Sequence, residues 1–338
     1  MKKIYLIVCL FSISNVLSQE NINDIFAAGI NDAQTFTGDY LAPATEGAMF
    51  SISNGWFNSA DAKPLLGFEI GIIGNITSVK DERKSFTLNV ADYENLEFAD
   101  GSPSKEVATA LGDIDGIGVV VEGPAPGSID DAEFTLPSGF NPSGVNFIPS
   151  GFIQASVGLI KGTEVKVRFL PKVKTDDVKV GFYGFGVQHD FTKWLPADKV
   201  IPVAISALIG YTHLDGSYDF TDTSIIEGEN QRIESKMNTW VFQAIVSTKL
   251  PVINFYGSLG YLTGKSETDI LGTYRVQQGP IVGTDMEEVV DPFSVTNKAS
   301  GVRTTIGTKL KLGFFRLNAE YTLAKYNNFN FGVNFGFR

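Results

Sequence analysis

Two histidines are the residues of this chain whose chemistry could most readily support catalysis. His189 and His213 are the only two, and His213 is followed by Asp215 and Ser217, residue types that membrane-barrel hydrolases combine. Neither histidine lies beside a second histidine or a glycine-flanked serine of the hydrolase type. We therefore expect structural roles for both and no enzymatic activity. A hydrolase centred on His213 is an alternative.

An acidic segment offers the next candidate chemistry. Residues 91–135 contain eleven acidic side chains and one basic side chain, and Asp113, Asp115 and Glu122 resemble part of a calcium loop. The remaining ligands of such a loop are missing at the required spacing. We therefore expect no resident metal, no cofactor, and a solvated surface loop that meets lipopolysaccharide. Calcium binding by these three residues is the alternative.

Cysteine usage and net charge exclude several other functions. The single cysteine, Cys9, lies in an N-terminal segment that we expect to be removed, which leaves no disulfide, thiolate metal site or cysteine nucleophile. The net charge of −11 disfavours a nucleic-acid partner. Binding, passage of a solute and structural roles remain.

The N-terminus has the pattern of an export signal. Lys2 and Lys3 precede an apolar run over residues 4–13, and Ser18 supplies the small residue of a cleavage point. The run is shorter than the roughly 20 residues that a membrane-spanning helix needs. We predict a signal peptide over residues 1–18. Residues 19–45 then form an N-terminal segment, which is either a plug or a mobile tail.

From about Gly67 onward, apolar and small polar residues alternate in segments of roughly ten residues separated by turns, which is typical of an outer-membrane barrel. We predict an all-β fold, a transmembrane antiparallel β-barrel of about 12 strands within a range of roughly 10 to 14. The barrel covers residues 46–338, with its first strand at residues 46–57. A soluble β-sandwich is the alternative.

The last segment shows the pattern most clearly. One of its faces is entirely apolar, and we expect that face to meet lipid and to serve as the signal for the barrel-insertion machinery: Phe329, Phe331, Val333, Phe335 and Phe337. The protein is thus predicted to reside in the cell outer membrane, with outer-membrane lipid among its partners.

The connections between segments differ in length in a regular way. Counting back from a periplasmic C-terminus places short connections, residues 79–84 among them, in the periplasm. The long acidic connections over residues 93–151, 215–230 and 265–300 then lie outside the cell. Short turns inside and long loops outside are the rule for such barrels.

The face opposite the lipid carries the charges of the last strands. We predict a lumen wall of mixed charge, which either packs by ion pairs or forms a constriction that selects solutes: Arg303, Lys309, Lys311, Arg316 and Glu320. The apolar phase also slips by one residue around Gly184 and Gly186. We interpret that slip as a bulge in the wall, since glycine removes the steric obstacle.

Several stretches resemble a family of uncharacterised outer-membrane proteins of Bacteroidota. They are AGINDAQTFTGDYLAPATEGAMFSISNGWFNSA (residues 28–60), KGTEVKVRFLPKV (residues 161–173), VKVGFYGFGVQHDFTKWLP (residues 178–196) and the final FGVNFGFR. That family is distantly similar to FadL-type channels for hydrophobic compounds, whose barrels have fourteen strands and an N-terminal plug. The strand that ends in Gln188, His189, Asp190 and Phe191 is most like them. The plug departs from theirs, because no Asn-Pro-Ala type segment has a clear counterpart.

This resemblance implies passage or uptake of a small hydrophobic or amphiphilic solute. A barrel of this size suits a narrow or plugged lumen better than an open porin channel. The first alternative is a surface scaffold or secretion-associated barrel that binds partners through its outer loops, and the second is the hydrolase.

Overall fold

The computed structural model describes residues 25–121, 132–139, 146–175, 178–195, 202–219, 228–277 and 286–337. The predicted signal peptide, residues 1–18, lies outside the described residues. No helix in the described ranges is long and apolar enough to span a membrane.

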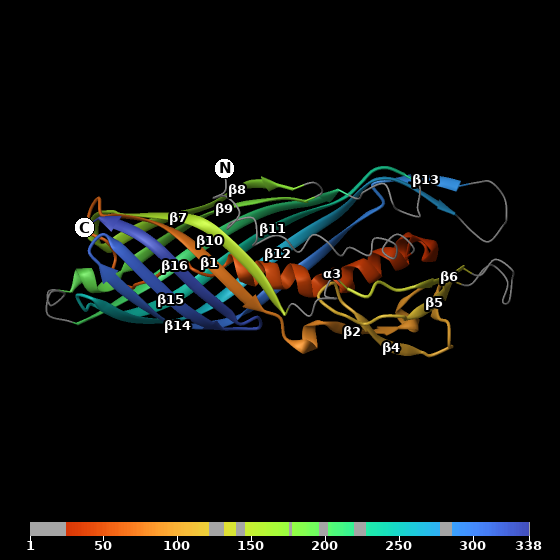
Figure 1. The fold of residues 1–338 in the computed structure, drawn as a ribbon, viewed down its shortest axis with the longest axis horizontal. Coiled ribbons are helices and arrows are strands. Elements are labelled where there is room, and N and C mark those ends of the chain that lie inside the picture. Colours follow the sequence, from red (N-terminus) through yellow and green to blue (C-terminus); the bar gives the residue numbers. More distant parts are fainter. Residues whose placement is uncertain are drawn as a thin grey trace, which may run out of the picture.

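The described strands form a closed antiparallel barrel of ten strands, because β11 pairs with β12 after the sheet has run through the other eight. Figure 1 shows the barrel wall as one end of an elongated molecule. The predicted fold class is therefore confirmed, with a strand number inside the expected range and below its central value. The wall strands are β1 (Phe68–Ser78), β7 (Phe147–Gly158), β8 (Thr163–Lys174), β9 (Val178–Asp190), β10 (Val203–Asp219), β11 (Gly228–Thr248), β12 (Ile253–Gln277), β14 (Phe293–Leu312), β15 (Phe315–Leu323) and β16 (Asn328–Phe337).

Residues 46–57 were predicted as the first strand, and this was wrong. Residues up to Ile52 belong to the helix α3 (Ile30–Ile52), and β1 is the first strand of the barrel. The prediction failed because α3 enters the lumen, where neighbouring residues such as Met49, Phe50 and Ile52 are all buried. A segment that is buried on every side has no polar face, so its sequence shows neither a helical nor a strand period.

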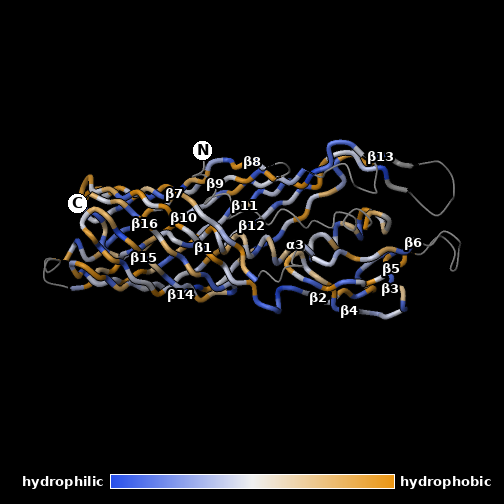
Figure 2. Tube along the Cα trace, in the orientation of Figure 1, coloured by the Kyte–Doolittle hydropathy of each residue, from blue (hydrophilic) through white to orange (hydrophobic). Residues whose placement is uncertain are grey.

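The wall has an apolar outer belt. Along β16 the residues of the predicted insertion signal face outward, and Phe329, Phe331, Phe335 and Phe337 are exposed on the barrel surface. Figure 2 shows hydrophobic and hydrophilic residues alternating along the strands. On β11 the exposed outward residues of the belt are Trp240, Phe242, Ala244 and Val246.

One end of the barrel carries short turns and the other long connections. The C-terminus of β16 and the start of β1 pair at the short-turn end, through Phe337 and Phe68. Toward the other end, the long-loop end, β10, β11, β12 and β14 extend well past the belt. The segments predicted as loops 215–230 and 265–300 are therefore partly strand, and β13 (Met286–Val290) pairs only with β12.

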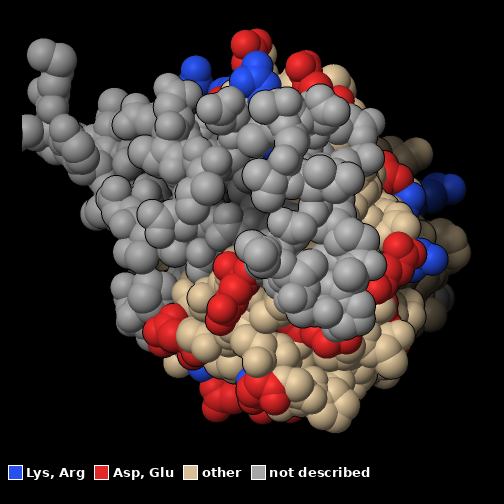
Figure 3. Space-filling model, turned by 90° about the vertical axis from the view of Figure 1, so that its right-hand side faces the viewer, with Lys and Arg blue, Asp and Glu red and all other residues tan. Residues whose placement is uncertain are grey.

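The connection between β1 and β7 builds two small sheets at the long-loop end. One contains β2 (Ser85–Asn89) and β4 (Ser104–Ala108), and the other contains β3 (Leu96–Phe98), β5 (Gly118–Val121) and β6 (Ala132–Thr135). Residues 79–84 follow β1 into this region, so their predicted place at the short-turn end was wrong. Figure 1 shows the sheets beside α3, and Figure 3, which views this end, shows acidic side chains on its surface.

The predicted bulge at Gly184 and Gly186 is absent from the described ladder. Both residues pair in register with β8 and with β10. The register shift lies on β8 instead, between Leu170 and Val173. The apparent slip arises because Phe182 points into the lumen and is buried there, whereas most inward positions of β9 carry small or polar residues.

Candidate functional site: the plugged lumen

A single continuous segment fills the barrel. The helix α3 starts among the outer sheets and runs into the lumen, and residues 53–67 continue to the short-turn end, where β1 begins (Figure 1). We call residues 25–67 the plug. The plug was predicted within residues 19–45. Residues 25–40 pack among the outer sheets instead, and the part that fills the lumen lies largely in residues 46–67.

The inner half of α3 packs against apolar side chains from the wall. This apolar cluster is almost entirely buried and includes residues of eight wall strands. Two of its rings, Phe152 of β7 and Phe182 of β9, contact edge to face with centroids 5.3 Å apart. Its main members are Met49, Phe50, Ile52, Ile73, Phe152, Leu170, Phe182, Leu214, Met237 and Leu262.

Two buried arginines hold the end of α3. Arg168 donates to the carbonyl of Ile52 over 2.8 Å, and Arg303 donates to the carbonyl of Ser53 over 3.0 Å. A helix leaves its last carbonyls without partners and carries partial negative charge at this end, so two cations there are favourable. The plug is therefore held by charge-assisted hydrogen bonds at the middle of the barrel.

The indole of Trp56 lies beside the end of α3 that these arginines hold. The Arg168 guanidinium stacks over it, 3.5 Å from the ring centroid. A Cβ atom at Gly186 would stand 2.7 Å from the indole, and one at Gly210 2.6 Å from it. Gly186 thus admits the plug rather than bending the wall.

A turn at the long-loop end clamps the outer part of α3. Tyr326, between β15 and β16, donates its hydroxyl to the carbonyl of Pro43 over 2.8 Å. Lys325 bonds to Glu46 over 2.6 Å. Burial, and then the nearby Glu46 carboxylate, raise the pKa of Tyr326, so it remains a donor at all physiological pH values.

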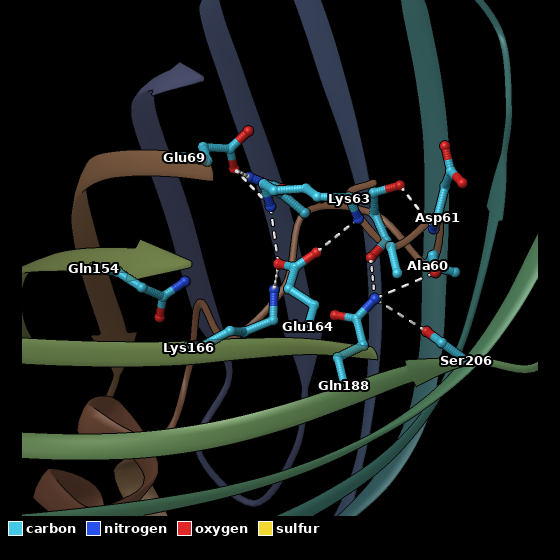
Figure 4. A network of polar contacts seen from close by, with 12 residues as sticks. Ala60, Asp61, Lys63, Glu69, Gln154, Glu164, Lys166, Gln188 and Ser206 are labelled. Carbon is cyan, nitrogen blue, oxygen red and sulfur yellow. Dashed lines mark hydrogen bonds and ion pairs between the residues drawn. The ribbon is translucent and has the colours of Figure 1, made fainter. Parts of the chain in front are cut away.

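A buried ion network joins the plug to the wall at the short-turn end (Figure 4). Glu164 of β8 accepts from Lys63 of the plug over 2.8 Å and from Lys166 over 2.6 Å. Glu69 of β1 accepts from Arg316 over 2.6 Å and from Lys309 over 3.1 Å. Two carboxylates therefore serve four cations.

The network borders a cavity of about 300 Å³. The plug contributes one side of it, and β8, β14 and β15 contribute the other. A second cavity, of about 280 Å³, lies toward the long-loop end and is lined by residues of β8 to β11.

The predicted lumen-wall residues lie in two places. Arg303 contacts the plug as described, and Glu320, which is also buried, accepts from the Tyr256 hydroxyl over 3.1 Å. Lys309, Lys311 and Arg316 line the cavity at the short-turn end. Both functional readings of this wall, ion-pair packing and solute selection, stay predictions.

The pairing between the wall strands β7 and β8 is incomplete and leaves a weak seam. β7 pairs with β1 from Phe147 to Val157, but it pairs with β8 only from Ile153 to Gly158. Beyond Leu170, β8 pairs with β9 alone. The half of β7 toward the long-loop end therefore has no described strand on its β8 side, a stretch of about 20 Å at the usual rise per residue.

The apolar cluster lies directly behind this seam. Phe152 and Leu170 are the first residues past the last β7–β8 pair, and both are buried members of the cluster. On the outside, Phe147 is exposed at the level where Ile76 and Phe329 belong to the belt. Apolar side chains therefore border the seam on both faces of the wall, the belt on the outside and the apolar cluster on the inside.

The two histidines lie in separate sets of contacts. His213 bonds to Asn238 over 2.8 Å and to Asp215 over 3.2 Å, and its ring lies against that of Tyr183. His189 bonds to the Thr163 hydroxyl over 3.0 Å. Ser217 instead lines the cavity toward the long-loop end.

The predicted calcium residues are not brought together in the described structure. Asp113 and Asp115 lie in an irregular stretch between β4 and β5, and Glu122 lies outside the described residues. No group of three or more potential metal ligands occurs in the described ranges.

Replacing Glu164 with glutamine should destabilise the folded barrel by about 3–5 kcal/mol, because two buried lysines lose their shared carboxylate. The measurement is the urea midpoint of unfolding in lipid vesicles, followed by tryptophan fluorescence. Glu267→Gln is the control, since its partner Lys265 and its own carboxylate are both half exposed and the midpoint should hardly move. Equal midpoints for the two variants would refute the buried network.

Sequence reasoning missed the part of the site that the plug supplies. Lys63, Glu69 and Glu164 carried a usable signal, because charged residues in or beside alternating strands point inward and need partners. Nothing in the sequence indicated that Trp56 would lie against two wall glycines.

No curated protein sequence matches this chain. Solved structures similar to it include Ail, the attachment invasion locus protein of Yersinia pestis, with 9% identity, a TM-score of 0.27, and 81% of this chain and 100% of that chain covered. The outer membrane protease OmpT from Escherichia coli shares 8% identity with a TM-score of 0.30, covering 84% and 99%. The P. putida toluene transporter TodX shares 7% identity with a TM-score of 0.14, covering 80% and 89%.

These likenesses are weak and carry no conclusion for this chain. The sequence model of one family, by contrast, matches residues 1–337. The chain therefore belongs to the family of unknown function DUF6588.

Proposed function

We propose that this protein is exported to the outer membrane and admits small hydrophobic or amphiphilic compounds sideways from the lipid, through the β7–β8 seam, into the apolar cluster. The seam carries the proposal. A compound dissolved in lipid would meet no fully paired strand there, and behind the seam it would find the buried rings of Phe152 and Phe182.

Packing contacts, and not hydrophobic transfer, supply the driving force. A compound that leaves lipid for an apolar site gains little from hydrophobic transfer, so the site must compete through packing contacts. The apolar cluster supplies such contacts, because wall strands and α3 surround it with apolar side chains. Onward passage then requires the plug to move, since the plug fills the lumen.

The resemblance to FadL-type channels supports the same function. In the membrane, the short-turn end faces the periplasm and the long-loop end faces the exterior, as short turns and long loops usually do. No enzymatic activity is part of the proposal, and none of the described contacts of His213 suits a nucleophile.

A photoreactive probe tests the proposal directly. Dodecanoic acid with a terminal diazirine should label the inward residues Phe152 and Phe182 in vesicles, in addition to outward residues such as Phe185 that touch lipid. Leu170→Trp puts a larger side chain directly behind the seam and should reduce labelling of the inward pair severalfold, because this buried position has no room for both the indole and a probe.

Ile205→Trp is the matched control, because Ile205 is an exposed aliphatic residue on the lipid face of β10. It should leave the inward labelling unchanged. Labelling confined to outward residues in the wild type would refute entry through the seam.

The outer sheets favour a second function, the binding of a partner at the cell surface. Their surface is acidic (Figure 3), and they rise from the long-loop end on a connection of their own. A scaffold would keep its partner when the seam is closed, whereas a channel would lose its uptake, so the two functions are separable by experiment.

A further inference from the structure

The cavity at the short-turn end contains more positive than negative charge. Five cations belong to it, in a chain whose net charge is −11: Lys63, Lys166, Lys309, Lys311 and Arg316. Three carboxylates accompany them, those of Asp61, Glu69 and Glu164. Asp61 is already bonded to a further cation, Lys193, over 2.8 Å.

The excess is unusual because the groups are buried. Lys166 and Lys309 have side chains only 4% exposed, and Glu69 and Glu164 are at most 5% exposed. Removing an ammonium group from water is unfavourable unless a counter-charge compensates it. Shared carboxylates compensate these lysines incompletely, since each carboxylate serves two cations closely.

Lys311 shows where the uncompensated charge lies. The only hydrogen bond that the described part of the chain gives its ammonium group is a long one, 3.5 Å, to the Leu250 carbonyl. Its side chain projects inward two residues after that of Lys309, near the turn at Gly313. Asp61, on the plug side of the cavity, has a side chain that is 32% exposed. The cavity is therefore open to solvent from this end.

From this charge balance we infer that the cavity is a binding site for a small soluble dianion of the phosphate class. Lys311 donates a hydrogen bond to the dianion. Lys166 and Lys309 each use one N–H donor for the dianion and keep another for their carboxylate. A dianion suits the site because the cations among its described lining residues outnumber the carboxylates. A lipid headgroup does not, because the wall strands separate this cavity from the membrane.

The site also touches the plug, since Lys63 is both a lining residue and the plug's bond to Glu164. A dianion that draws Lys63 and Lys166 away from Glu164 weakens the attachment of residues 53–67 to the wall. Binding of the dianion does not depend on hydrophobic passage and is measured without it.

Isothermal titration calorimetry on the full-length protein in a neutral detergent, at low ionic strength, tests this inference with inorganic phosphate as the probe. Saturable binding is expected, and Lys311→Gln should weaken it about tenfold or more, because a charge-assisted hydrogen bond is lost. Lys298→Gln removes the same charge from an exposed position of the same strand and should leave the affinity unchanged.

Three outcomes decide the matter. Phosphate binding that Lys311→Gln weakens and Lys298→Gln does not supports the site. The inference is overturned by an absence of saturable heat in the wild type, or by equal losses in the two variants, which would indicate diffuse attraction to the surface. Boiled and unboiled samples on a gel confirm that each variant is a folded barrel, so a misfolded variant is not counted. Loss of photolabelling at the seam would leave this result untouched.

Discussion

A chain that lacks residues 25–63 should conduct ions through a lumen that the complete protein keeps closed. The plug occupies the barrel from the apolar cluster to the ion network. Without the plug, water replaces it along a wall rich in buried polar side chains such as Arg168, Arg303 and Gln188. Ten strands then enclose a narrow pore.

Planar-bilayer recording measures this effect. We expect discrete conductance steps at least about tenfold above those of the complete chain, as expected when a filled lumen becomes aqueous. Deletion of β13 is the control, because that strand pairs only with the outer end of β12 and leaves the lumen filled. Equal conductance in the deleted and complete chains would show that the plug does not seal the barrel.

The wall of the barrel could be predicted from the sequence because the alternation of residues within each strand depends only on what lies on its two faces. Lipid on one side and lumen on the other impose a period of two, and β16 shows that period from Phe329 to Phe337 without interruption. The same period placed Arg303, Lys309 and Glu320 on the lumen face, where they lie.

The contents of the barrel could not be predicted in the same way. Residues 46–57 show no informative period, because the enclosing wall buries nearly every side chain of this stretch. The period of β9 was misread for a related reason, since Phe182 lies on the inward face and packs in the apolar cluster around the inner end of α3. In both cases the structure depends on contacts with residues far away in the chain, and a single sequence does not show which residues those are.

The outer region shows a third kind of difference. The outer halves of β11 and β12 lie past the apolar belt, so they lack the lipid-facing signal and resemble loops in sequence. Backbone pairing with each other holds them as strands, from Trp240 and Thr263 outward to Gly228 and Tyr274. Their polar outward faces meet water instead of lipid.

Closing the seam should abolish uptake. If the β7–β8 ladder were extended past Ile153 and Phe169, Gly151 would lie opposite Pro171, so cysteines at these two positions can be joined by a short bifunctional thiol reagent. The mature chain is predicted to contain no other cysteine. A closed seam leaves the apolar cluster intact and removes only the route from lipid to it.

The decisive measurement is uptake of radiolabelled dodecanoate by cells that carry the Gly151→Cys, Pro171→Cys variant, before and after cross-linking. We predict that cross-linking lowers uptake to the level of cells without the protein. Cross-linking the pair Ile70→Cys and Phe335→Cys, which face each other on the fully paired strands β1 and β16, should have no effect. Undiminished uptake through a barrel cross-linked at the seam would contradict lateral entry.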